Sequence, residues 1–102
     1  MNFHIESQKM FEMSQKLILV ENIAEKYKDL FGIAPWVDNG NSFRMKLKNG
    51  CTALVKFDEN QLLVYNGGDC WREVNKDYVN FLVELQNLVD SFKQVNQPVQ
   101  TA

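Results

Sequence analysis

Histidine is the scarcest residue type in this chain, and its scarcity excludes several kinds of chemistry. Of the 102 residues, one is histidine and two are cysteine. A tetrahedral zinc site needs four closely spaced ligands, which Cys51 and Cys70, 19 positions apart, do not supply. Catalysis by a Cys70 thiolate would need a histidine beside it, and none follows His4. The sequence therefore predicts no metal site, no cofactor and no enzymatic activity.

Long apolar runs and glycine-rich phosphate loops are also missing. No run approaches the roughly 18 apolar residues that a membrane span needs. Residues 1–7 lack the basic-then-apolar order of a secretory signal, and the pair Gly67-Gly68 fits neither nucleotide-binding glycine pattern. We therefore expect a cytoplasmic protein without membrane contact, with both cysteines as free thiols.

Two stretches of apolar residues at alternating spacings of three and four predict long helices. The first stretch consists of Met10, Met13, Leu17, Val20, Ala24, Tyr27 and Phe31, and the second of Val74, Tyr78, Phe81, Leu85, Leu88, Phe92 and Val95. We expect one helix over residues 7–31, capped by Ser7 and ended by a left-handed Gly32 and by Pro35. We expect another over 76–95, capped by Asn75.

Between the two helices, apolar residues alternate with basic ones, which predicts an antiparallel sheet. Phe43, Met45 and Leu47 alternate with Arg44, Lys46 and Lys48, and residues 51–57 alternate likewise. A two-residue turn at Asn49-Gly50 would mix the two faces of this hairpin. A three-residue loop over 48–50, with Gly50 left-handed, instead places Leu47 opposite Cys51 and gives one apolar face.

A second hairpin follows, with its turn predicted at residues 58–61. This turn would pair Phe57 with Leu62 and Leu54 with Tyr65. A short strand at Val37 and another at residues 70–74 would bring the total to between three and five. The predicted fold is α+β: a long N-terminal helix, an antiparallel sheet of three to five strands and a long C-terminal helix. It forms a single domain over residues 1–95, followed by a flexible tail over 96–102.

This order of elements is similar to that of two known classes of domain. Double-stranded RNA-binding domains also run helix, three strands, helix, and a resemblance to them implies binding of duplex RNA through a helix face and a strand loop. Residues 17–65 resemble in patterning the small acidic chaperones of type III secretion, which implies a dimer formed through helices. Because residues 43–57 carry four cations and no acid in a chain of net charge −2, the rest carries −6, which disfavours nucleic acid.

The sequence favours a non-enzymatic protein-binding module, such as a small bacterial or mobile-element adaptor, or a phage-type inhibitor of a host system. The outer face of the sheet is expected to bind an acidic protein partner, and the overhanging start of the first helix to form a homodimer or a further contact. The nine candidate partner-binding residues are Arg44, Lys46, Leu54, Lys56, Leu63 and Tyr65 on the sheet, and Met10, Met13 and Leu17 on the helix. A solvated sheet face and an ordinary core stripe remain the alternatives for these two groups.

Overall fold

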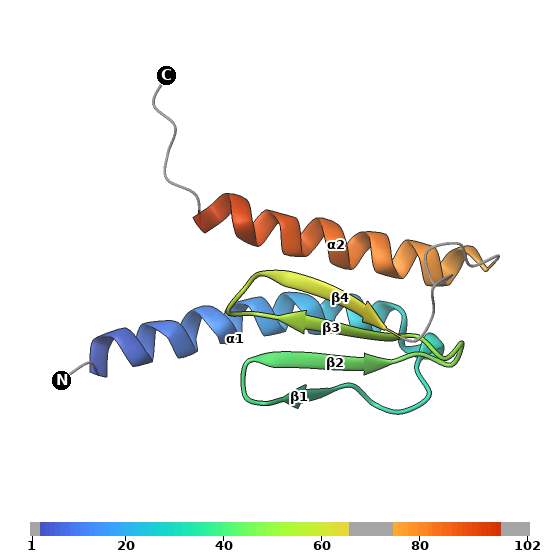
Figure 1. The fold of residues 1–102 in the computed structure, drawn as a ribbon, viewed down its shortest axis with the longest axis horizontal. Helices are drawn as coiled ribbons and strands as arrows, with labels where there is room; N and C mark the ends of the chain where they lie inside the picture. The colour runs from blue at the N-terminus through green and yellow to red at the C-terminus, as the bar shows by residue number, and fades with distance from the viewer. Residues whose placement is uncertain (1–2, 66–74, 97–102) are drawn as a thin grey trace, which may run out of the picture.

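A computed structural model describes residues 3–65 and 75–96 of the chain, with side chains over 10–65 and 75–93. It confirms the α+β fold (Figure 1), in which one helix precedes and one follows the strands of an antiparallel sheet in the chain. The elements in chain order are α1 (Phe3–Lys26), the 3-10 turn η1 (Lys28–Leu30), β1 (Trp36–Asp38), β2 (Ser42–Lys46), β3 (Thr52–Lys56), β4 (Gln61–Tyr65) and α2 (Lys76–Asn96). The strand predicted at residues 70–74 lies outside the described residues, as does the tail beyond Asn96.

The first helix differs from the prediction at both ends. It already includes Phe3, so Ser7 lies inside the helix and is not its cap. It ends at Lys26, and Phe31 is extended with φ −93° and ψ 139°. The backbone of Phe31 bridges to Leu47, and the Gly32 N–H donates to the Lys46 carbonyl at 3.1 Å. The predicted left-handed Gly32 is therefore wrong, because the Gly32 N–H donates to the sheet and not back to the end of the helix.

The four strands form an antiparallel meander in the order β1-β2-β3-β4. The predicted first hairpin is confirmed, since Met45 lies opposite Ala53 and Phe43 opposite Val55. Its loop covers residues 48–50, where Gly50 has φ +93°, and the Leu47 N–H donates to the Cys51 carbonyl at 2.8 Å.

Gly50→Ala should lower the free energy of unfolding by about 1 kcal/mol, because an L side chain is strained in the left-handed region. No heavy atom lies within 4 Å of the added Cβ, so backbone conformation alone sets the cost. Urea unfolding would measure it. The matched control is Gly32→Ala, whose new Cβ also meets nothing within 4 Å and whose φ is not left-handed. Equal stabilities of the two variants would contradict the loop assignment.

The predicted register of the second hairpin is wrong by two residues. Val55 lies opposite Leu62 and Leu54 opposite Leu63, while Lys56 and Gln61 close a loop over residues 57–60. Phe57 does not pair with Leu62 of β4 as predicted. Its N–H instead donates to the Asn41 carbonyl at 2.9 Å. A shift of two keeps every side chain on its predicted face, because the side-chain period of a strand is two.

The core lies between the inner face of the sheet and both helices. Phe43, Met45 and Leu47 pack in one cluster with residues of α1 and α2. Asn75 caps α2 as predicted, because its Oδ1 accepts the Asp77 N–H at 3.0 Å. The sulfur of Cys51 is disulfide-bonded, so the prediction of free thiols is wrong.

A polar contact joins the two helices at the surface. The Tyr27 hydroxyl donates to the Glu84 carboxylate, and Lys26 Nζ lies 3.1 Å from Glu84 Oε1. The hydrogen bond to Glu84 raises the pKa of Tyr27 to about 12. The hydrogen bonds from Tyr27 and then Lys26 lower the pKa of Glu84. The contact therefore favours a neutral tyrosine and an ionised glutamate.

Tyr27→Phe should lower the free energy of unfolding by about 1 kcal/mol at neutral pH, the net value of such a hydrogen bond. Because the pKa of Glu84 is lowered on folding, its contribution is present above the ordinary carboxyl pKa of about 4.3 and is lost as the pH falls through the lowered pKa. The Tyr27 contribution is present below pH 10 and is lost as the pH rises through about 12. Urea unfolding at several pH values should show the variant and the wild type converging in acid. A variant as stable as the wild type at pH 7 would argue against this contact.

Candidate protein-interaction surfaces

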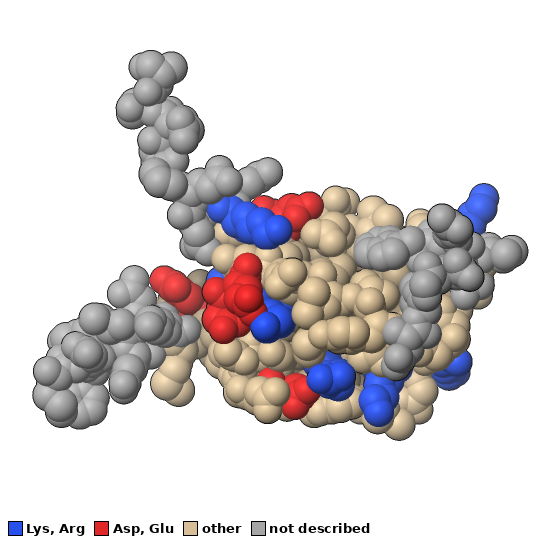
Figure 2. Space-filling view, viewed as in Figure 1, with Lys and Arg blue, Asp and Glu red and all other residues tan. Residues whose placement is uncertain are grey.

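The outer face of the sheet brings six of the predicted residues together. One cross-strand row runs through Trp36, Arg44, Leu54 and Leu63, and the next through Lys46, Thr52 and Tyr65. A third row contains Asp38, Ser42, Lys56 and Gln61. Both described helices contribute to the core on the opposite face. Figure 2, in the view of Figure 1, shows an uncharged centre with charged side chains around its margin.

The cations of this face differ in how they are neutralised. Arg44 Nε lies 2.8 Å from Asp38 Oδ2, and Lys56 pairs with Glu59. The hydrogen bond to Glu59 raises the pKa of Lys56. Lys46 is exposed, and its ammonium sits 5.7 Å from the centre of the Trp36 ring with no acid within 4 Å among the described residues. Of the three cations of this face, Lys46 is therefore the one whose charge is least neutralised by a neighbouring acid, and it is the most available to an acidic partner.

The six residues are not equally available to a partner. Tyr65 is 41% exposed, whereas Leu54 is only 7% exposed, so the Leu54 side chain offers a partner almost no accessible surface. The prediction that Tyr65 lies opposite Leu54 is wrong, because Tyr65 lies opposite Thr52 and Leu63 takes the place beside Leu54. Trp36 was not among the predicted residues, although its place three residues before the turn at Asn39-Gly40 puts it in the Arg44 row. The available surface is Trp36, Leu63 and Tyr65 with Arg44, Lys46 and Lys56 around them.

The start of α1 exposes a second apolar surface that includes only one of the three predicted residues. Met10 is 66% exposed, whereas Met13 and Leu17 are partly buried and pack against the core. The other large exposed residues of this helix are Phe11 at 62%, Ile18 at 56% and Leu19 at 46%. Sequence reasoning missed these three because they do not belong to the heptad pattern that packs on the core. The spacing of seven between Phe11 and Ile18 was the signal that could have found those two.

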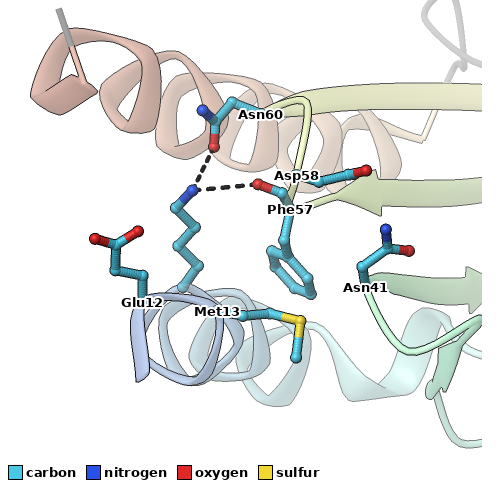
Figure 3. A pocket seen from close by; sticks show the side chains of 7 residues that line it. Glu12, Met13, Asn41, Phe57, Asp58 and Asn60 are labelled. Carbon is cyan, nitrogen blue, oxygen red and sulfur yellow. Dashed lines mark hydrogen bonds between the residues drawn. The ribbon is translucent and has the colours of Figure 1, made fainter. Parts of the chain in front are cut away.

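A groove of about 480 Å³ separates α1 from the loop ends of the sheet (Figure 3). Lys16 crosses it from α1, and its ammonium donates to the Phe57 carbonyl at 3.2 Å and to Asn60 Oδ1 at 2.7 Å. The same ammonium lies 5.5 Å from the centre of the Phe92 ring. Glu12, Met13, Asn41 and Asp58 complete the lining. Lys16 already hydrogen-bonds within the protein. In this groove it therefore links α1 to the loop of the second hairpin.

Neither a metal centre nor a membrane span is found in the described part of the chain. Residues 3–65 and 75–96 contain no group of three or more His, Cys, Asp or Glu placed to hold a metal ion. Neither described helix is both long enough and apolar enough to cross a bilayer. No protein-family model, curated protein or solved structure matches this chain.

Proposed function

We propose that this protein is a non-enzymatic protein-binding module, a small adaptor or inhibitor of bacterial or mobile-element type. The proposal is supported above all by the residue composition of the outer face of the sheet. It combines an exposed tyrosine, a partly exposed tryptophan and a leucine with three cations on one side of a single sheet. Aromatic residues and arginine are the types most enriched among interface anchors.

The charge of this face supports an acidic protein as the partner. Arg44 and Lys56 already have an acid within ion-pair distance, while Lys46 has none among the described residues. A partner carboxylate reaching Lys46 would therefore meet a cation with little local competition. Charges at the rim of an interface act mainly on the rate of encounter, and apolar anchors act on the lifetime of the complex.

The same ion pairs weigh against the nucleic-acid alternative. Phosphate binding draws its affinity from cations that release counterions, and Asp38 and Glu59 reduce the field of two of the three cations.

Homodimer formation, as in the chaperone-like alternative, is part of the proposal and rests on the exposed α1 residues. The cytoplasmic location stays a proposal, and the disulfide at Cys51 removes the free-thiol argument for it.

Lys46→Glu tests the proposed role of this face in encounter with the partner. We expect the association rate to fall several-fold with little change in the dissociation rate, and added salt to reduce the difference between variant and wild type. Surface plasmon resonance against the captured partner would measure both rates. Lys93→Glu, the same charge change on an exposed residue of α2, is the matched control. If both variants slow association equally, this face is not where the partner docks.

A further inference from the structure

The exposed apolar residues of α1 form a stripe on the side of the helix that faces away from the core. Phe11 and Ile18 are seven positions apart, or about two helical turns, so they lie on the same face. Val20 and Ala24, on the opposite side, are buried in the core. Ser14 and Gln15, which lie between Phe11 and Ile18, are exposed and uncharged. The stripe thus has two large apolar residues around a neutral centre, with the exposed Met10 and Leu19 next to them in sequence.

We infer that this stripe binds a second copy of the chain, with the two α1 helices antiparallel around an axis between Ser14 and Gln15. This inference rests on the homodimer part of the proposed function and names its surface. In this arrangement Phe11 of each copy faces Ile18 of the other, and the neutral residues meet at the axis. A two-fold interface needs a patch that is complementary to itself, and a stripe symmetric about its centre meets that need.

The acidic residues of α1 decide between the two orientations. A parallel pair would place Glu21 against Glu21 and Glu25 against Glu25, which like-charge repulsion disfavours. The antiparallel pair places positions 21 and 25 opposite positions 8 and 4, neither of which carries an acid. Only the antiparallel pair therefore buries the apolar stripe without juxtaposing carboxylates.

A second copy also fits this stripe better than a helix-binding groove of another protein does. Helices that dock in grooves present anchors at i, i+3 or i+4, and i+7. Here the middle positions are Ser14 and Gln15, so a deep groove would have to bury polar side chains without matched partners. At a two-fold axis, the Gln15 amide and the Ser14 hydroxyl of the two copies supply donors and acceptors to each other.

Complementary single variants test both the surface and the orientation. Light scattering on the full chain at tens of micromolar should give twice the 11.9 kDa chain mass. Phe11→Glu and Ile18→Lys should each weaken self-association at least tenfold and give one chain mass, with unchanged circular dichroism. Val83→Glu, at an exposed apolar residue of α2, is the matched control and should stay dimeric.

Mixing the two variants then fixes the orientation. An antiparallel pair sets the introduced glutamate of one chain against the introduced lysine of the other and leaves Ile18 against Phe11, so the equimolar mixture should regain twice the chain mass. A mixture that stays at one chain mass would overturn the antiparallel pairing. A dimer that persists in Phe11→Glu alone would place the interface elsewhere and overturn the inference. A wild-type chain at one chain mass would overturn the homodimer, while partner binding by the sheet face, assayed through Tyr65, would stand.

Discussion

Phe81→Ala should lower the free energy of unfolding by about 3–5 kcal/mol, the range for removing a buried phenylalanine ring. Phe81 is fully buried, and its ring centre lies 5.4 Å from those of both Tyr27 and Phe31. Through Phe81, α2 therefore contacts Tyr27, which directly follows α1, and Phe31, whose backbone bridges to Leu47 just after β2. Since domains of this size are stable by about 5–15 kcal/mol, the variant should be close to unfolding at room temperature.

Urea unfolding followed by circular dichroism measures this loss. Val83→Ala, at an exposed residue two positions further along α2, is the matched control and should change stability by no more than about 0.5 kcal/mol. A Phe81→Ala variant that lost less than about 1 kcal/mol would mean that α2 does not pack as described.

Tyr65→Ala should weaken partner binding by about 2 kcal/mol or more, roughly 30-fold in Kd, because this exposed aromatic at the end of β4, opposite Thr52, is the best placed anchor of the outer face. Folding should be little affected, since Tyr65 is 41% exposed. Isothermal titration calorimetry against the captured partner measures the first effect and thermal unfolding the second.

The control for Tyr65 is Val37→Ala. Val37 is about as exposed as Tyr65, and it lies opposite Phe43 and so points to the other face of the sheet. Its loss should leave binding unchanged. If Tyr65→Ala bound normally but melted much lower, Tyr65 would belong to the packing of the protein and not to its binding surface.

Much of this fold follows from periodicity that is local in sequence. The Leu47–Cys51 register was predictable because the alternative turn would have mixed the two faces of the hairpin. The second hairpin was misplaced because Phe57 hydrogen-bonds to Asn41, a residue of a different hairpin. The end of α1 was misplaced for a similar reason, since Phe31 bridges to Leu47. Contacts between distant segments leave no local signal.

The sequence likewise predicted which strand residues share the outer face, but not which residues of α1 are exposed. The six sheet residues share a face because a slip of two preserves the side-chain alternation, but the slip moved Tyr65 away from the Arg44 row. How much of α1 the rest of the protein covers depends on tertiary packing. The heptad pattern therefore pointed to Met10, Met13 and Leu17, of which only Met10 is exposed, while Phe11, Ile18 and Leu19 outside the pattern are exposed as well.

Comparative capture from an extract of the native host tests the central claim most directly. The tagged full chain, its Tyr65→Ala variant and the Val37→Ala control would each be incubated with nuclease-treated extract at matched concentration. Quantitative mass spectrometry would then compare the bound proteins. We predict an acidic protein that is retained by the wild type and by Val37→Ala and is depleted at least tenfold with Tyr65→Ala. Identical bound proteins for all three would contradict a protein-binding sheet face, and so would a protein that the wild type retains from untreated extract but not from nuclease-treated extract.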